Sequence, residues 1–320
     1  MTTSRRPPLP FRVLAAALAA ASCLPAQELP GVRLSLSSRP YASARGDVEV
    51  KLAIETTADA VVPGDLLTAV RLDVRCDGAA LPPIAVAGKG GEVALAAGTR
   101  IERTLRLPGR ALLPSPTHGV TGAVALALTG HPAAACELEV APDPAHVDLA
   151  ALDLARTQVV LATNLGDLRL SFRPDKAKGH VENFVKLCLQ GFYDGTKFHR
   201  VVRGFMVQGG CPLTKDDAAQ DKWGSGGPGY TIPAEFNDLR HLRGTLSMAR
   251  TSDPNSAGSG FFLCHRDAPH LDRKYTAFGN LVAGADVLDR IAEAPVGGPT
   301  RELPIAPVEV HAAIVLPVKK

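Results

Sequence analysis

Aromatic residues are nearly absent from the first half of this 320-residue chain. Residues 28–140 contain no phenylalanine, tryptophan or methionine, and Tyr41 is their single aromatic residue. A carbohydrate-binding β-sandwich is expected to offer aromatic platforms, so this half does not have the composition of one. Nine of the ten phenylalanines lie at or beyond Phe172, so the chain divides by composition into two halves.

The chain also lacks a strong excess of charge. Segment 1–26 contributes three of the 35 lysine and arginine residues and none of the 32 acidic residues, so the remainder has a net charge near zero. A near-neutral surface does not attract polyanions, which argues against nucleic acid as a partner. After residue 26 the sequence has no segment long and apolar enough to span a membrane.

The N-terminal segment 1–26 has the pattern of a secretory signal peptide. Arginines at positions 5, 6 and 12 precede the short apolar run 13–24, and the small residue Ala26 follows. We predict export to the periplasm or cell envelope. Two variants stay open: residues 4–6 weakly match a twin-arginine signal, and residues 20–23 weakly match a lipoprotein box in which Cys23 would carry a lipid anchor.

Residues 28–142 alternate apolar and polar side chains in short runs separated by Gly, Pro and Asp. This period of two predicts an antiparallel β-sandwich-like domain, whose role the sequence does not indicate. The two prolines of "APDPAH" (141–146) indicate a linker, which we place at 143–156. The predicted strands are 47–56, 69–76, 100–107, 122–130 and 135–142.

Two cysteines of this domain, Cys76 and Cys136, each lie at the end of a predicted strand. In an oxidising compartment they are candidates for a disulfide. The alternative is a pair of buried free thiols. We expect the disulfide.

The second half changes its pattern. Residues 163–172 have the alternation of a β-hairpin with its turn near Gly166-Asp167, and 307–316 is typical of a closing strand. Apolar residues at spacings of three and four predict helices over about 181–190 and 284–293. Many strands with two isolated helices favour a β-barrel capped by helices, in a chain that is dominated by β-structure.

Five ordered segments of this half resemble the motifs of cyclophilins, a family of peptidyl-prolyl cis-trans isomerases. The resemblance covers about 157–317 and implies an eight-stranded antiparallel barrel with two capping helices. It also implies proline-containing polypeptides as partners. The segments are "FHRVVRGFMVQGG" (198–210), "GSGGPGYTIPAEF" (224–236), "GTLSMAR" (244–250), "NSAGSGFFL" (255–263) and "HLDRKYTAFG" (270–279).

The reaction that the resemblance implies can be argued from elementary chemistry. Rotation about an X-Pro bond has a barrier near ~20 kcal/mol, because the nitrogen shares its lone pair with the carbonyl. Twisting the bond localises that lone pair and makes the nitrogen a better acceptor. A fixed guanidinium then binds the twisted state more strongly than either planar state. Such a site needs an apolar pocket for the proline ring and no metal or other cofactor.

The resemblance assigns roles to eleven residues. Arg200 matches the catalytic arginine, and Gln208 matches the residue that supports it and holds the substrate backbone. Substrate-binding positions fall in three groups. The proline pocket is matched by Phe205, Met206, Phe262 and Leu271; the groove wall by His199, His270 and Tyr275; and the backbone that pairs with the peptide by Ala249 and Arg250.

The sequence departs from the family at three of the site positions. Gly260 stands where glutamine is usual, His270 where the best-known eukaryotic members have tryptophan, and Tyr275 where they have histidine. The tryptophan contributes much of the affinity for the cyclic inhibitor cyclosporin in sensitive members. Gly260 removes a polar part of the wall and favours the alternative of a non-catalytic module or scaffold that binds proline-containing segments.

Other readings of the second half are weaker. The glycine-rich segment 224–229 lacks the Lys-Ser/Thr of a phosphate-binding loop. His265, His270 and Asp272 fit no common metal-site spacing, so no metal is expected. We therefore predict an exported isomerase. Its clients and its oligomeric state are not indicated by the sequence.

Overall fold

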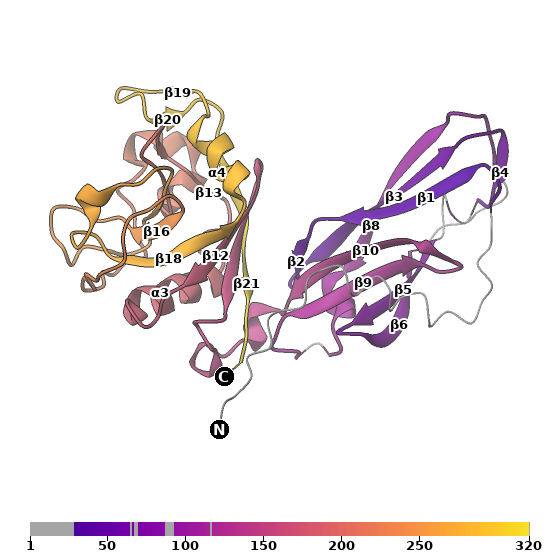
Figure 1. Cartoon of the computed structure of the whole chain (residues 1–320), viewed down its shortest axis with the longest axis horizontal. Coiled ribbons are helices and arrows are strands. Elements are labelled where there is room, and N and C mark those ends of the chain that lie inside the picture. The colour runs from indigo at the N-terminus through magenta and orange to yellow at the C-terminus, as the bar shows by residue number, and fades with distance from the viewer. Residues whose placement is uncertain (1–28, 65, 67–69, 87–92, 116, 320) are drawn as a thin grey trace. The chain divides into compact units, whose positions relative to one another are not determined.

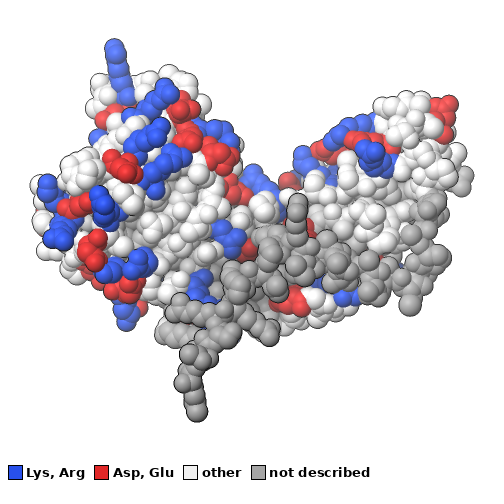
Figure 2. Space-filling view, in the orientation of Figure 1, with Lys and Arg blue, Asp and Glu red and all other residues white. Residues whose placement is uncertain are grey.

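The computed structural model describes residues 29–64, 66, 70–86, 93–115 and 117–319, so the predicted signal peptide and Cys23 lie outside the described residues. The chain divides after Asp143 into two compact units (Figure 1). On the face in view, basic and acidic side chains are intermixed, with larger uncharged areas between them (Figure 2). Among the described residues no helix is both long and apolar enough to cross a membrane.

The first unit is built from two larger sheets and a small two-stranded one. One sheet has the order β1-β3-β8 and the other the order β2-β10-β9-β5-β6, while β4 pairs with β7. Their bounds are β1 Val32–Ser38, β2 Tyr41–Ser43, β3 Asp47–Thr56, β4 Ala60–Val62, β5 Val70–Cys76, β6 Ala79–Val86, β7 Val93–Leu95, β8 Arg100–Pro108, β9 Gly122–Leu128 and β10 His131–Ala141.

Both larger sheets contribute to one apolar core. In β3 the side chains of Val48, Val50 and Leu52 are buried, while Glu49 and Lys51 between them are exposed. Because successive side chains of a strand point to opposite faces, this alternation gives the sheet one apolar and one charged face. The apolar face shares a core with buried residues of β5, β9 and β10.

The expected disulfide between Cys76 and Cys136 is absent, and both are free cysteines. Strand β9 separates them, because Cys76 pairs with Val124 and Cys136 pairs with Leu126 of that strand. Two strand spacings amount to about 10 Å, whereas a disulfide needs Cα atoms within about 7 Å. The Cys76 sulfur instead packs under Gly122, where a Cβ would lie 2.5 Å from it.

The second unit is dominated by one curled antiparallel sheet. Its order is β13-β21-β11-β12-β18-β16-β17-β15-β14. The bounds are β11 Gln158–Thr163, β12 Gly166–Phe172, β13 Thr196–Lys197, β14 Arg200–Val202, β15 Met206–Gly209, β16 Thr245–Met248, β17 Phe261–Cys264, β18 Ala277–Ala283 and β21 Glu309–Leu316. The end strands β13 and β14 are consecutive in the chain, so the sheet curls until its ends come together, as in a barrel.

The structure has nine strands in this sheet, and the prediction was eight. The difference lies at β13 and β14, two short strands that are separated by Phe198 and His199. Residues 163–172, predicted to be a whole hairpin, form only the turn and the second strand of one: β11 ends at Thr163, which pairs with Gly166 of β12, so the turn lies at Asn164-Leu165. The predicted closing strand is β21, which pairs with both β11 and β13.

Two α-helices pack against this sheet: α3 (Lys178–Leu189) contacts β21 and β18, and α4 (Ala285–Ala292) contacts β12, β14 and β15. The α4 residues Val287, Leu288 and Ile291 are buried, as their spacing predicts. A small hairpin follows α4, formed by β19 (Val296–Gly297) and β20 (Leu303–Pro304). Short 3-10 helices lie at Gly109–Leu112, Pro144–His146, Leu149–Ala151, Pro212–Lys215, Asp217–Lys222 and Pro269–Leu271.

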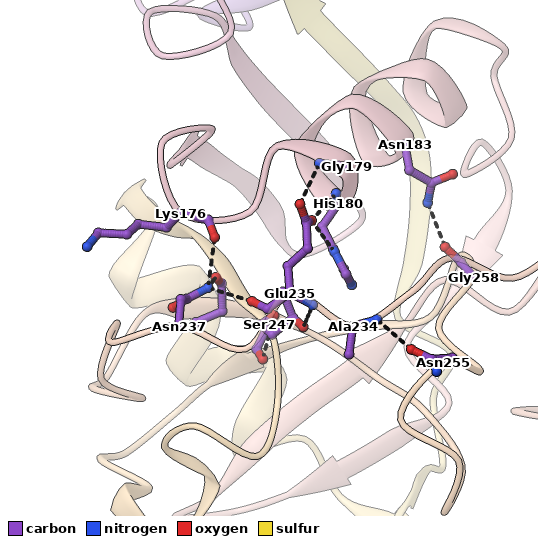
Figure 3. Close-up of polar contacts among 12 residues, drawn as sticks. Lys176, Gly179, His180, Asn183, Ala234, Glu235, Asn237, Ser247, Asn255 and Gly258 are labelled. Carbon is purple, nitrogen blue, oxygen red and sulfur yellow. Dashed lines mark hydrogen bonds and ion pairs between the residues drawn. The ribbon is translucent and has the colours of Figure 1, made fainter.

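Helix α3 begins three residues before the predicted start because a distant carboxylate caps it. Its N-cap position is Ala177, which provides no side-chain hydrogen bond. The carboxylate of Glu235 instead accepts from the backbone N–H groups of Gly179 at 3.0 Å and His180 at 2.9 Å, and lies 2.6 Å from His180 Nδ1 (Figure 3). These bonds satisfy first-turn donors and place a negative charge at the positive end of the helix.

The predicted linker 143–156 is largely part of the second unit. Leu152 and Leu154 are buried in its core, and Val147 and Leu149 pack against that core. The Asp153 N–H donates to the Val318 carbonyl at 2.7 Å, which ties the segment to the C-terminal end of the chain. The segment ahead of β11 therefore extends the second fold and does not act as a free connection.

Candidate functional site

Three residues that the sequence assigns to the site lie in one row across three neighbouring strands. Arg200 of β14 pairs with Gln208 of β15, and Gln208 pairs with Phe262 of β17. Residues directly opposite each other in antiparallel strands share a face of the sheet. The register of these short strands therefore brings a cation, an amide and an aromatic ring together, although Arg200 and Phe262 are 62 residues apart in the sequence.

An apolar cluster adjoins this row. Met206, Phe262 and Leu271 are buried in it together with Cys264 and Ala268, while Phe205, Ala249 and Tyr275 pack against them. The rings of Phe262 and Tyr275 meet edge to face, with centroids 5.9 Å apart. The structure thus gathers all four predicted proline-pocket residues into one cluster, separate from the main core of the unit.

Phe205 owes its position to a residue that the sequence analysis did not assign. The His265 N–H donates to the Phe205 carbonyl at 2.8 Å, and the Gly204 N–H donates to His265 Nδ1 at 3.0 Å. The other ring nitrogen lies 3.1 Å from an oxygen of Asp289 in α4. His265 therefore fixes the tight turn between β14 and β15, at which Gly204 has a φ of 78°.

Arg200 is held by a second residue that the sequence analysis missed. Its Nε donates to Glu302 Oε2 at 2.7 Å and its Nη2 donates to Glu302 Oε1 at 3.3 Å. The hydrogen bond from Arg200 lowers the pKa of the Glu302 carboxyl, so the pair is ionised at neutral pH. Glu302 lies in an irregular segment far along the chain, and its spacing gives no signal of this contact.

Gln208 and His199 contact each other beside Arg200. The Gln208 amide nitrogen lies 3.4 Å from His199 Nε2. The side-chain partner of Arg200 is therefore Glu302, and not Gln208 as the sequence predicts. Burial lowers the pKa of His199 to about 4, and the nearby Arg200 charge adds to the effect. The imidazole is therefore neutral at pH 7.

The glycine-rich segment 224–229 lines a cleft of about 440 Å³ together with His199, Gln208 and Gly260. Gly224 has a φ of 91°, and a Cβ there would lie 3.2 Å from the His199 ring. This close approach to the imidazole in a left-handed conformation requires glycine. The segment is thus a wall of the site, which the comparison with phosphate loops did not reveal.

Ala249 and Arg250 lie on the same cleft. The Ala249 N–H donates to the Gly260 carbonyl at 2.9 Å, so that donor is already engaged. The Arg250 guanidinium lies over the Tyr275 ring at 4.4 Å and donates to the Lys274 carbonyl at 2.9 Å. Arg250 therefore stacks on the wall residue Tyr275 and closes that side of the apolar cluster.

The two remaining departures from the family leave open space. His270 is exposed, with its ring centroid 5.3 Å from that of Phe205. A Cβ on Gly260 would meet Ala249 Cβ at 3.4 Å, which is ordinary contact, and the backbone there needs no positive φ. The backbone at position 260 therefore accepts a Cβ without strain.

The second unit is similar to known proteins. The family model described as cyclophilin type peptidyl-prolyl cis-trans isomerase/CLD matches residues 158–313, which lie within the second unit. A peptidyl-prolyl cis-trans isomerase of Synechococcus elongatus is 53% identical over 123 residues, 38% of this chain and 79% of that protein. One of Helicobacter pylori is 41% identical over 149 residues, 45% of this chain and 86% of that protein.

A cyclophilin type peptidyl-prolyl cis-trans isomerase of Cryptosporidium parvum, crystallised with the dipeptide Ala-Pro, is 30% identical and matches with a TM-score of 0.44. The match covers 51% of this chain and 99% of that one. On the identity and coverage of its relatives, the chain belongs to the family of cyclophilin-type peptidyl-prolyl cis-trans isomerases.

Proposed function

We propose that the second unit catalyses cis-trans isomerisation of X-Pro bonds in exported polypeptides, with Arg200 as the catalytic residue. The observation that supports this most directly is the row of Arg200, Gln208 and Phe262 on β14, β15 and β17, beside the apolar cluster that contains Phe205, Met206 and Leu271. A permanent cation and a hydrophobic pocket are the two elements that the reaction needs.

In the proposed mechanism, Phe205, Met206, Phe262 and Leu271 bind the proline ring and hold it while the peptide on its N-terminal side rotates. As the bond twists, the prolyl nitrogen regains its lone pair and accepts a hydrogen bond from Arg200. This bond is stronger in the twisted state than in either planar state, so it lowers the barrier. No bond is broken and no proton is transferred.

The proposed exported role rests on the pattern of residues 1–26. Three arginines, a short apolar run and a small residue at its end are typical of a secretory signal. Folding outside the cytoplasm includes slow X-Pro steps, which take tens to hundreds of seconds without catalysis. Fractionation of cells that express the chain with and without residues 1–26 tests this part.

The experiment that tests the catalytic role compares the chain with Arg200→Ala on an Ala-Pro peptide, by exchange NMR. We expect the variant to lose most of the rate. We also expect its free energy of unfolding to change by less than about 1 kcal/mol, because the Arg200 side chain is 41% exposed and such ion pairs contribute little. An Arg200→Ala enzyme of unchanged rate contradicts the mechanism.

A second candidate function is a non-catalytic module that binds proline-containing segments. Gly260 favours it, because a polar wall residue is missing next to Phe262. Peptide binding with the affinity of an enzyme–substrate complex, but without any acceleration of exchange, would support this alternative.

A further inference from the structure

The Arg200 guanidinium makes a two-point contact with Glu302. Nε and Nη2, which lie along one edge of the planar group, each donate to a different carboxylate oxygen, at 2.7 Å and 3.3 Å. Two parallel hydrogen bonds of this kind set the plane of the guanidinium as well as its position. The Arg200 side chain is 41% exposed, so packing alone leaves it several rotamers.

Glu302 is itself fixed relative to the strand that carries Arg200. The Val201 N–H donates to the Glu302 carbonyl at 2.7 Å, which joins the two backbones next to the ion pair. The following residues, Leu303 and Pro304, pair with Gly297 and Val296 in the β19–β20 hairpin. The carboxylate is therefore held from its own backbone, and it does not reach Arg200 from a free loop.

The contact also determines which Arg200 hydrogen-bond donors are available to a substrate. Nε and one hydrogen of Nη2 are engaged, so the Nη1 group and the second hydrogen of Nη2 are the donors that remain outside the pair. Gln208, the residue expected to support Arg200, has its amide nitrogen near His199. Within the described residues, Glu302 is the side chain that orients the catalytic cation.

We infer that Glu302 is a positioning residue of the isomerisation site, which holds Arg200 with its Nη1 edge presented to the twisted X-Pro bond. This inference rests on the proposed function, since it has meaning only if Arg200 acts on the substrate. A positioned donor is already oriented when the nitrogen becomes an acceptor, so removing the support should lower turnover more than substrate binding.

The test measures kcat and KM for an Ala-Pro peptide with Glu302→Ala and Glu302→Gln in the full chain. We expect Glu302→Ala to lower kcat by about 10- to 100-fold, the loss typical of a displaced catalytic group, with KM changed by less than about 3-fold. Glu302→Gln keeps an acceptor for one of the two hydrogen bonds, so its kcat should fall by a smaller factor. Both variants should keep the circular dichroism spectrum of the parent protein.

A matched control is Glu293→Gln, which removes a carboxylate that contacts Arg203 at 3.3 Å in an exposed pair of the same unit. It should leave kcat and KM unchanged. Added formate, a small carboxylate, should restore part of the rate of Glu302→Ala but none of the rate of Arg200→Ala. A merely structural role of Glu302 would give no such rescue.

The outcomes separate this inference from the proposed function. If Arg200→Ala is inactive and Glu302→Ala has the parent kcat, Glu302 has no positioning role although the isomerase assignment stands. If Glu302→Ala is faster than the parent, the carboxylate competes with the substrate for Arg200, which overturns the inference. If Arg200→Ala is fully active, the proposed mechanism itself fails.

Discussion

The imidazole of His241 lies nearly parallel to the ring of Phe262, with centroids 6.1 Å apart and planes 17° apart. His241 is buried, and its ring nitrogens lie 3.1 Å from Asp272 Oδ1 and 3.0 Å from Ser247 Oγ. The same Asp272 oxygen accepts a hydrogen bond from the backbone N–H of His241 at 2.8 Å. These contacts fix the surface against which the pocket residue Phe262 rests.

We predict that His241→Ala lowers both stability and catalytic efficiency. The variant leaves a cavity and removes a partner from Ser247 and Asp272, so a loss of about 2–4 kcal/mol in the free energy of unfolding is expected. Phe262 can then tilt into the vacated space, and kcat/KM should fall. Urea unfolding and exchange NMR check the two effects. His311→Ala is the control, because that histidine is half exposed. Equal kcat/KM values in the two variants would show that His241 does not support Phe262.

The motifs of the second unit contain most of the residues that the structure brings together at the candidate site, because these residues belong to a few short strands. Arg200, Gln208 and Phe262 each stand within a recognisable segment, and pairing between neighbouring strands brings those segments together. Glu302 and His265 could not be predicted in the same way. Each acts through long-range contacts from a position outside the five recognisable segments.

The first unit shows a different limit. Alternation located β3, β5, β8, β9 and β10, but not β1, the short strands β2, β4 and β7, or the edge strand β6. Pro82 and Pro83 interrupt β6 at a register shift in its pairing with β5, and prolines argue against a strand from sequence alone. Alternation also says nothing of strand order, so it could not show that β9 lies between Cys76 and Cys136.

Strand order leads to a prediction about redox state. Treatment of the folded chain with a reductant should change the free energy of unfolding of the first unit by less than about 1 kcal/mol, whereas loss of a native disulfide costs about 2–5 kcal/mol. Burial raises the pKa of Cys76 to about 12, so its thiol should react with iodoacetamide only after unfolding. Mass spectrometry that finds Cys76 joined to Cys136 would contradict the observed strand order.

The partly buried imidazole of His199 predicts a pH dependence of stability. In the unfolded chain it takes up a proton near pH 6.5, but in the folded protein only near pH 4. Between these values the unfolded state binds more protons, so stability falls as the pH drops through this window. The contribution is of the order of 3 kcal/mol and is fully present above about pH 6.5.

His199→Gln should remove this contribution. The free energy of unfolding is to be compared for the parent and the variant at pH 7, 5.5 and 4.5 by urea titration with circular dichroism. We expect the parent to lose more stability than the variant on acidification, while the other buried histidines contribute equally to both. If the free energy of unfolding falls equally with pH in the parent and the variant, His199 does not titrate in this way.

The last prediction concerns the wall beyond the proline pocket. His270 is exposed beside Phe205 where sensitive relatives have tryptophan, and Gly260 provides no side chain where glutamine is usual. The loss of one aromatic contact and one polar partner should weaken cyclosporin binding by about 2–4 kcal/mol, or roughly 30- to 1000-fold, while the pocket for the proline ring stays complete.

We therefore expect weak inhibition by cyclosporin together with isomerase activity, and a tighter complex in His270→Trp, Gly260→Gln and above all the double variant. The replacement at 260 is sterically permitted, because its Cβ would make ordinary contact with Ala249 and the backbone is unstrained. Calorimetric Kd values and kcat/KM separate the two effects. The Kd for cyclosporin should fall much more than kcat/KM changes, since neither position touches the Arg200–Glu302 pair.

The control is His311→Trp, which adds the same ring at an exposed site away from this wall and should leave the Kd for cyclosporin unchanged. Nanomolar inhibition of the parent protein, or no gain in the double variant, would show that positions 260 and 270 do not form the inhibitor-binding wall.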